Sequence, residues 1–475
     1  MRGQASLQYG PQFGGMVNYI LKNGAEIKKP FQYETNQAVG SNGMLNTYNA
    51  VGGDTRKFHY YAYIDHRNSE GWRANSRYYT NAGFVTFTYK INERFSVTSE
   101  VMHSHINSQQ PGGLTDAEVQ SDARMSHRSR NWIDIKWNTA ALIGNYFFNE
   151  KKNTRLNVKL FGVLADRANI GNVMPITIKD SINPATLQFN NRQSDRDLYF
   201  NLGSELRFLT DYSLFGHKNT ISAGIRFFRG NTSRSRLGVG DNGTTFNTNF
   251  IVKNQDLDLI TNNSAAFVEN IFRLGNRLLV IPGIRYENLS MMAEGRLSYS
   301  SSGEENLIAP ANRKRNLLLP GIGAEYKINE LTRIYTNYSK AYRPMLFYDV
   351  TVLPSIEVVD PGLKDSKGYN LDIGCKGKID EYLIFDLSVY HLQYNKRIGV
   401  IKQQSQEGSF YNYRTNVGNS STNGVEGLVE ISPLAFSGKR PIVNLRMFAT
   451  YSYTDARYED FKVITLDNKI GRAHV

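Results

Sequence analysis

The chain has 475 residues, of which 40% are hydrophobic and 12% aromatic, and it carries a formal net charge of +13. Its mean hydropathy is −0.45, and the absence of any run of about 18 consecutive apolar residues excludes a membrane-spanning helix. The single cysteine, Cys375, excludes a disulfide framework and a zinc site built on thiolates, whereas the positive charge is compatible with a nucleic acid, an anionic lipid or an anionic ligand as partner.

The first element, residues 1–25, is rich in glycine. Gly10, Gly14 and Gly15 permit tight turns ahead of a short segment that contains Asn18. No charged region followed by an apolar core opens the sequence, so no signal peptide is predicted.

From about residue 31 onward, segments of roughly ten residues alternate apolar with polar side chains. Between residues 57 and 67, one face carries Phe58, Tyr60, Ala62 and Ile64, and the other carries His59, Tyr61, Tyr63 and Asp65. The same period of two recurs at residues 94–101, 156–160 and 443–452. Each such segment is predicted to be a strand with one face suited to lipid and one suited to water.

The connections between these segments largely alternate between short and long. Tight turns are predicted at 90–93, 274–276 and 327–330, and long polar loops at 103–131, 168–195, 229–255, 292–315, 343–367 and 403–411. An up-and-down barrel with short turns at one end has this arrangement, whereas a propeller or solenoid would repeat its loops more evenly.

The predicted fold class is therefore all-β, a large antiparallel transmembrane β-barrel, because only a closed barrel satisfies every strand hydrogen bond in lipid. About 17 strands can be counted against the roughly 22 of a plugged transporter barrel, so the barrel is expected to be incomplete. A soluble all-β extracellular adhesin, whose polar face would also alternate, is the alternative fold. Residues 470–475 break the alternation, and because one reading frame of a common sequencing adapter encodes IGRAHV, they are predicted to be a non-native tail.

Several motifs resemble one known family. The opening RGQASLQYGPQFGGMVNYILKNG resembles the end of the plug domain of TonB-dependent outer-membrane receptors, where RG-x-x-S-x-x-YG precedes GG-x-V-N. Four later stretches are similar to barrel strands of that family: IPGIRYE (281–287), RIYTNYSKAYRP (333–344), DLSVYHLQYNKRIG (386–399) and NVGNSSTNGVEGLVE (416–430). Residues 109–132 and YRPMLFYDV are most similar to the ferric-dicitrate receptor branch.

The resemblance implies a location in the bacterial outer membrane and two domains. Residues 1–25 would be the C-terminal end of a plug domain and residues 26–469 a transmembrane barrel with long extracellular loops. Most of the plug, including the TonB box, and the last barrel strands are expected to be absent.

The implied function is import of a ferric chelate, such as ferric citrate or a siderophore, into the periplasm. The implied partners are the TonB complex, the small anionic chelate, outer-membrane lipid and lipopolysaccharide, with no nucleic acid and no resident cofactor. A SusC-like importer of glycans or oligopeptides, which shares the barrel and plug, is the alternative function.

An anionic chelate should be bound by guanidinium groups, whose fixed fork matches carboxylates. The candidates are placed in the third, fourth and fifth outer loops: Arg124, Arg128 and Arg130; Arg192 and Arg196; and Arg229, Arg234 and Arg236. The alternative for any one of them is a solvated or lipopolysaccharide-facing charge. Trp132, Phe347 and Tyr348 could form an apolar wall for the ligand, although most aromatics of such a barrel lie at the lipid interface.

Direct metal binding and catalysis find little support in the sequence. His103, His105 and His127 have no spacing typical of a metal site. The chain has no Gly-x-Ser-x-Gly, HExxH or GxxxxGK[ST] motif, so the protein is not expected to be an enzyme.

Overall fold

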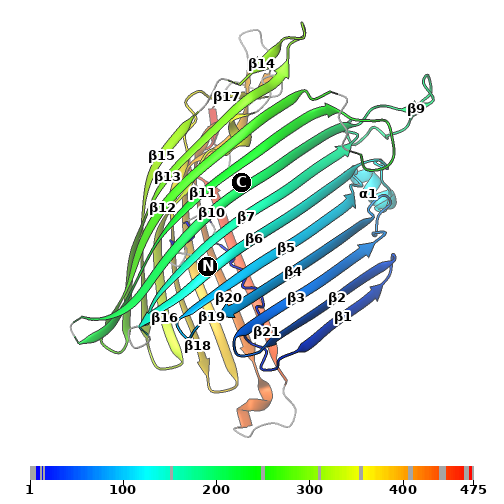
Figure 1. Ribbon diagram of the computed structural model, residues 1–475. Helices are drawn as coiled ribbons and strands as arrows, with labels where there is room; N and C mark the ends of the chain where they lie inside the picture. Colours follow the sequence, from blue (N-terminus) through cyan, green and yellow to red (C-terminus); the bar gives the residue numbers. More distant parts are fainter. Residues whose placement is uncertain are drawn as a thin grey trace.

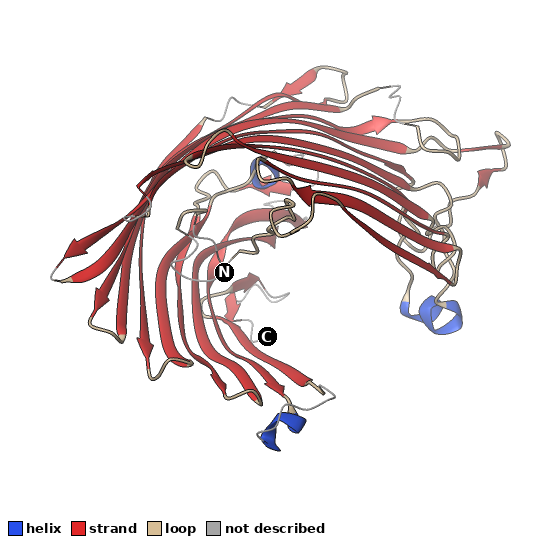
Figure 2. Ribbon diagram, turned by 60° about the horizontal axis from the view of Figure 1, so that its bottom comes forward, coloured by secondary structure: helices blue, strands red, loops and turns tan. Residues whose placement is uncertain are grey.

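The computed structural model is dominated by one curved sheet of 19 strands (Figures 1 and 2). It describes residues 7–10, 13, 16–149, 153–214, 216–247, 252–308, 312–351, 357–404, 410–437, 445–464 and 470–472. The predicted all-β class is confirmed. None of the helices in these described residues is long and apolar enough to cross a membrane.

Seventeen strands form the wall of the curved sheet. They are β1 (Gln32–Gly40), β2 (Met44–Asp54), β3 (Phe58–Ser69), β4 (Tyr78–Lys90), β5 (Phe95–Gln109), β6 (Trp132–Asn149), β7 (Thr154–Gly171), β10 (Gln193–Leu214), β11 (His217–Val239), β12 (Gln255–Leu274), β13 (Leu278–Tyr299), β15 (Arg313–Lys327), β16 (Thr332–Arg343), β18 (Ser366–Ile379), β19 (Leu383–Gln404), β20 (Phe410–Ile431) and β21 (Met447–Tyr458).

The remaining elements are short. They are β8 (Ile182–Asn183), β9 (Gln188–Phe189), β14 (Glu305–Leu307), β17 (Glu357–Val359), β22 (Lys462–Ile464), β23 (Ile470–Arg472), helices α1 (Asp116–Asp122) and α2 (Phe347–Val350), and the 3-10 helix η2 (Pro433–Ser437). Within the predicted tail, residues 470–472 form β23, which pairs with β22, and residues 473–475 lie outside the described residues.

Each wall strand pairs antiparallel with the next wall strand along the chain, so the sheet is a continuous up-and-down meander. Among the described residues β1 pairs only with β2 and β21 only with β20, so these two strands are the edges and the sheet does not close. Figure 2 shows the open side of the curve. The expected closed barrel is thus not seen, because closure would require hydrogen bonds between the two edges.

Most of the long connections lie at one end of the sheet, which we call the loop end, and most of the short turns lie at the other, the turn end (Figure 1). At the loop end, the third, fourth, fifth and seventh connections comprise residues 110–131, 172–192, 240–254 and 344–365. They are shorter than predicted because the strands continue through polar residues. β11 extends to Val239, although a loop was predicted from Arg229 onward.

The two faces of the wall differ in what they contact. Arg207, Arg285 and Tyr394 contact Tyr9, Leu7 and Phe13, respectively, which lie on the concave side, so these three wall side chains point inward. Side chains one position away point to the convex face. That face carries many exposed large apolar side chains; eight of them are 38–58% exposed, namely Val101, Leu142, Leu160, Leu202, Ile225, Phe227, Ile284 and Leu318. The predicted alternation of the strands is therefore present.

Two small apolar clusters lie on the concave side. Ala50, Tyr61 and Phe84 pack with Ile27 of the segment before β1. Leu257, Leu259 and Ala293 pack with Phe347 of α2, so the seventh loop reaches inward from the loop end to strands β12 and β13. Both contacts bring chain segments into the space that the sheet surrounds.

Candidate functional site

The N-terminal residues are fixed to the concave wall by one arginine of β13. Arg285 Nη1 donates hydrogen bonds to the carbonyl oxygens of Leu7 (3.0 Å) and Gln8 (3.4 Å), and the Leu7 side chain is fully buried. The ring of Tyr9 lies 5.0 Å from the guanidinium of Arg207 on β10. Two wall strands therefore hold the same short segment.

Arg285 is itself positioned by a carboxylate. Its Nε donates to Glu287 Oε1 at 2.5 Å, and the Tyr342 hydroxyl donates to Glu287 Oε2 at 2.6 Å. A side chain at Gly10 would place its Cβ 3.2 Å from Glu287 Oε1, and Gly10 has a φ of +99°, so glycine is required there.

Of the other predicted plug-motif residues, Asn18 donates to the Tyr9 hydroxyl at 3.4 Å. Gly14 and Gly15 lie outside the described residues. Gly10 thus has the backbone conformation that favours glycine, and the plug role of this segment stays a prediction.

Beside this segment the concave face contains a cavity of about 510 Å³. Its walls combine guanidinium groups with aromatic rings: Tyr9, Phe13, Arg226, Phe228, Arg285, Glu287, Tyr342, Arg343 and Tyr394 contribute, together with Asn263 and apolar side chains. Three arginines and one carboxylate leave this lining positively charged. Such a lining suits an anion that also has apolar or aromatic surface.

Arg343 reaches the cavity from the end of β16. Its Nη2 donates to the fully buried carboxylate of Asp349 on α2 (3.0 Å) and to the Tyr348 hydroxyl (2.6 Å). Its Nη1 is buried and has no hydrogen-bond partner in the described part of the chain. Arg414 donates to the same carboxylate at 3.1 Å, so the seventh loop fixes Arg343 while one of its donor groups stays unused.

Arg226 lies on β11 across the cavity. Its guanidinium packs near the rings of Phe161 (5.8 Å) and Phe228 (5.7 Å), and its Nε lies 3.5 Å from a Glu205 oxygen. That Nε makes no hydrogen bond within the described residues. Arg226 and Arg343 are therefore the cavity arginines that each have an N–H group without an acceptor in the described part of the chain.

The predicted loop arginines have different surroundings. Arg130 is 1% exposed, and its Nε and Nη2 donate to the two oxygens of Asp180 at 2.8 Å each. It also donates to the carbonyl oxygens of Asn190 and Asn242. One side chain of the third loop thereby joins the fourth and fifth loops.

Arg128 and Arg192 complete this connection. Arg128 donates to three carbonyl oxygens of the fourth loop, those of Met174, Pro175 and Ile178. Arg192 donates to the Arg130 carbonyl at 3.0 Å and forms an ion pair with Asp241. Burial would raise the pKa of Asp180, but the hydrogen bonds from Arg130 and Asn172 hold it below its usual value.

Four of the predicted loop arginines lie on strands instead, so their placement in loops was wrong. Arg196 is in β10 and pairs with both oxygens of Asp166 at 2.9 and 2.7 Å. Arg234 and Arg236 are in β11 and share Asp197. Arg229, also in β11, is exposed on the convex face. Strand pairing and cross-strand ion pairs continue past the apolar positions, with a register shift between β10 and β11 only beyond Arg196. The polar composition of this stretch had suggested a loop.

The remaining predicted residues are dispersed. Arg124 is exposed, with its guanidinium 5.7 Å from the Trp72 ring. Trp132 is buried and donates to the Thr244 carbonyl at 3.0 Å. Of the three aromatics expected to contact a ligand, Phe347 and Tyr348 lie on α2 next to Arg343, whereas Trp132 does not reach the cavity lining.

The three histidines singled out in the sequence do not come together. His103 pairs with Asn138, His105 with Asp134, and His127 with Glu118. In the described residues no group of three or more His, Cys, Asp or Glu side chains could hold a metal ion.

Glu118 makes the third loop sensitive to acid. The backbone N–H of Thr115, the His127 side chain and the Thr115 hydroxyl lower the pKa of Glu118 to about 2. Because the folded pKa lies below the ordinary value of 4.5, this carboxylate stabilises the loop above pH 4.5, and the contribution is lost as the pH falls toward 2. We expect the hydrogen-exchange protection factors of the α1 amides to fall in that window while those of the strands stay high. A Glu118→Gln variant should lose this pH dependence, and an unchanged profile in that variant would contradict the assignment.

Sequence reasoning missed Arg226, Arg285 and Arg343 as site residues. A signal was present in IPGIRYE, where Arg285 and Glu287 place opposite charges two residues apart on one face of an apolar strand. Arg343 had no such signal. Its position in the cavity depends on how the seventh loop folds, which its sequence neighbours do not indicate.

Comparison with known proteins gives one family match and several structural neighbours. Residues 31–472 match the family described as TonB dependent receptor-like, beta-barrel. No curated protein sequence matches.

Among solved structures, the ferric citrate transporter FecA in unliganded form superposes with a TM-score of 0.76 at 16% identity, covering 97% of this chain and 64% of that one. The ferric-catecholate import receptor Fiu from E. coli K12 gives 0.72 at 13% identity, covering 99% and 71%. The copper transporter OprC gives 0.71 at 15% identity, covering 94% and 64%. The chain thus spans just under two thirds of the ferric citrate transporter's length, and at these identities the likeness concerns the fold.

Proposed function

Because the chain belongs to the TonB-dependent receptor β-barrel family, and so lies in the bacterial outer membrane, we propose that it forms the barrel part of a receptor that imports a ferric chelate. This family consists of receptors and transporters, which agrees with the non-enzymatic interpretation. The loop end then faces the cell exterior and the turn end the periplasm. We further propose that residues 1–25 are the end of the plug domain, residues 26–469 the barrel, and the TonB complex the source of energy.

The observation that carries this proposal is the charged and aromatic cavity on the concave face. A ferric citrate or siderophore complex is an anion, and Arg226 and Arg343, which line the cavity beside Tyr9 and Phe13, each keep a buried N–H group with no acceptor among the described residues. Inside a barrel, where little bulk water screens the charges, guanidinium hydrogen bonds to carboxylate or catecholate oxygens are strong. A neutral glycan would leave these two charges uncompensated, which disfavours the SusC-like alternative.

In this proposal the predicted loop arginines divide into two groups. Arg128, Arg130 and Arg192 stabilise the outer loops, since their donors are used within the protein. Arg124 is available at the entrance, and the cavity arginines hold the ligand.

Binding to the intact receptor that contains this barrel tests the proposal. We expect Arg343→Gln and Arg226→Gln each to weaken binding of ferric dicitrate or a ferric siderophore about tenfold to hundredfold, which corresponds to losing a hydrogen bond from a charged donor of about 1.5–3 kcal/mol. Intrinsic fluorescence quenching measures the affinity, and Arg333→Gln, on the concave face but outside the cavity, is the matched control.

Growth of a receptor-deficient strain on a single iron source gives the corresponding functional result. Growth on ferric citrate would support the ferric-dicitrate branch, and growth on another chelate would keep the class but discard that substrate. Absence of growth on every ferric chelate, together with unchanged affinities in both cavity variants, would contradict the proposed function.

A further inference from the structure

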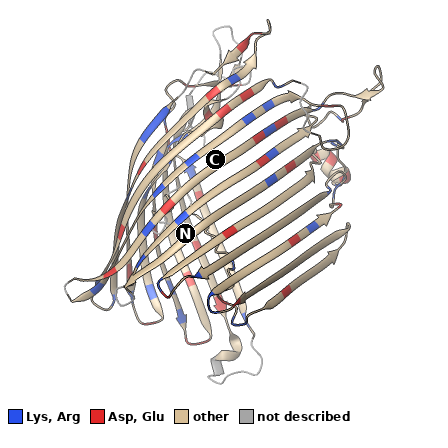
Figure 3. Cartoon of the chain, in the orientation of Figure 1, with Lys and Arg blue, Asp and Glu red and all other residues tan. Residues whose placement is uncertain are grey.

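A group of arginines gathers where the seventh loop leaves the wall. Two of them belong to the basic stretch that opens β15, and Figure 3 shows this stretch in blue at the loop end of the strand. The register places Arg313 opposite Met291 and Arg315 opposite Leu289. Both partners are buried and share the inward face of Arg285. Because directly paired residues share a face of the sheet, both guanidinium groups point to the concave side.

Three carboxylates attach these arginines and two others to the seventh loop. We call Arg313, Arg315, Arg343 and Arg414 the arginine cluster. Its ion pairs join Arg315 to Asp365, Arg343 to Asp349, and Arg414 to Asp349 and Glu357. Arg313 forms no ion pair with a described residue, and its side chain contacts Met345 instead. Four guanidinium groups are thus paired with three carboxylates.

Two of the carboxylates also bind adjacent backbone groups at the start of the loop. Asp365 accepts a hydrogen bond from the N–H of Met345, and Asp349 accepts one from the N–H of Leu346, each at 2.8 Å. The arginines paired with these two carboxylates are therefore held close to Met345. The Met345 side chain is buried.

The arginine cluster has more hydrogen-bond donors than acceptors. Arg315 Nη2 and Arg343 Nη1 are buried and have no partner among the described residues, and the Arg315 side chain is only 8% exposed. Arg313 Nη1 donates to the Met345 sulfur at 3.1 Å, although a thioether is a weak acceptor. Buried guanidinium donors without an acceptor are unfavourable. One strong acceptor is therefore lacking near Met345 in the described part of the chain.

An oxyanion has the chemistry that this place lacks. Guanidinium forks bind the oxygens of phosphate and carboxylate groups through paired N–H···O hydrogen bonds, which are stronger in a buried setting. Because the unpaired donor atoms are packed against protein, the anion takes the position of the Met345 thioether and not an existing cavity. Methionine is unbranched and flexible, so its side chain can move aside.

We propose that the arginine cluster binds one inorganic oxyanion of the phosphate type, in exchange for the Met345 thioether. The bound anion connects the loop ends of β15 and β16 with the start of the seventh loop and so restricts the motion of that loop. The lining of the proposed chelate cavity includes Arg343 but not Arg313, Arg315 or Met345. The anion site is therefore separate from the chelate and does not depend on its identity.

Isothermal titration calorimetry of the intact receptor with inorganic phosphate, at an ionic strength kept constant with sodium chloride, tests the site. We expect Arg313→Gln and Arg315→Gln each to weaken phosphate binding by about tenfold or more, the loss expected for one charge-assisted hydrogen bond. Met345→Leu removes the competing acceptor and should strengthen phosphate binding. Variants that only disturb the packing of the loop would not change the affinity in opposite directions. Heat-dependent gel migration verifies that each variant is folded.

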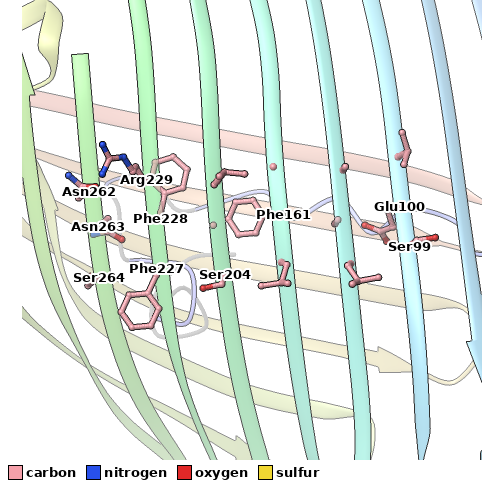
Figure 4. Close-up of a pocket in the computed structure, with 18 residues that line it drawn as sticks. Ser99, Glu100, Phe161, Ser204, Phe227, Phe228, Arg229, Asn262, Asn263 and Ser264 are labelled. Carbon is pink, nitrogen blue, oxygen red and sulfur yellow. The ribbon is translucent and has the colours of Figure 1, made fainter. Parts of the chain in front are cut away.

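Arg229→Gln is the matched control. Figure 4 shows Arg229 on β11, in an exposed groove of the convex wall, where it makes no ion pair with a described residue. This variant loses one positive charge, as the cluster variants do, but should bind phosphate as the unmodified receptor does. Hydrogen exchange gives a second measurement. Phosphate should slow exchange at residues 344–351 in Arg229→Gln and not in Arg315→Gln.

Three results would overturn the proposal. One is equal phosphate affinity in the unmodified receptor, Arg313→Gln and Arg315→Gln. The others are an equal loss of affinity in Arg229→Gln and equal protection of the seventh loop by chloride at the same ionic strength, because each would show a general effect of charge. A failure of the proposed chelate function would leave all of these measurements unchanged.

Discussion

Replacing Arg130 with alanine is expected to release the third, fourth and fifth outer loops from one another. The side chains of Arg130 and Asp180 are 1% and 2% exposed, so the substitution leaves a buried carboxylate with no guanidinium partner. Breaking such a pair costs about 3–5 kcal/mol. Three loop carbonyl groups that accept from Arg130 would also lose their donor.

Hydrogen exchange of the three loops, measured by mass spectrometry, tests this expectation. Exchange should accelerate by two to three orders of magnitude at residues 172–192, about 1.4 kcal/mol per factor of ten, while strands β12 and β13 stay protected. Arg124→Ala in the same loop is the control and should change little, because Arg124 is exposed. A double variant, Arg130→Met with Asp180→Leu, should recover most of the protection. Unchanged loop exchange in Arg130→Ala would show that the network does not hold the loops.

Replacing Arg285 with leucine is expected to free the N-terminal segment from the wall. Arg285 and Glu287 are 1% and 7% exposed, and the substitution leaves Glu287 with Tyr342 and without its guanidinium. The carbonyl groups of Leu7 and Gln8 lose the same donor. We expect a loss of about 3–5 kcal/mol for this buried pair, concentrated at residues 7–10.

Limited proteolysis of the intact receptor, followed by identification of the cleavage sites, measures this release. Arg333→Leu provides the matched control on the concave face. Arg333 forms an ion pair with Glu325, and the Arg333 side chain is 44% exposed. Such exposed ion pairs contribute about 0–1 kcal/mol to stability. Equal resistance to cleavage near Tyr9 in Arg285→Leu and the unmodified receptor would contradict the role given to Arg285.

The strands and their faces could be predicted because a period of two is a local property of the sequence. In β3, Ile64 was assigned to the lipid face and Tyr61 to the water face, and the structure places Ile64 67% exposed on the convex side and Tyr61 buried inside. Loop boundaries were less predictable. In β10 and β11, Arg196 and Arg234 continue regular pairing through ion pairs with residues of neighbouring strands, and a single sequence does not reveal such partners.

The cavity could not be predicted for a related reason. Arg226, Arg285 and Arg343 are separated by about sixty residues at each step, and they converge only because the meander curves and the seventh loop folds inward. Loop arginines were selected by their density in the sequence. The density of arginines favoured Arg128 and Arg130, whose donors are used within the loops, over the isolated arginines that line the cavity.

The orientation of the wall in the membrane can be measured directly at four consecutive residues of β11. In a Cys375→Ser background, single cysteines replace Ile225, Arg226, Phe227 and Phe228, and each carries a small fluorophore in proteoliposomes of the intact receptor. Brominated lipids should quench the fluorophores at 225 and 227 and leave those at 226 and 228 bright. Similar quenching at all four residues, or the reverse alternation, would contradict a wall with its apolar face in lipid and its arginines facing the proposed chelate.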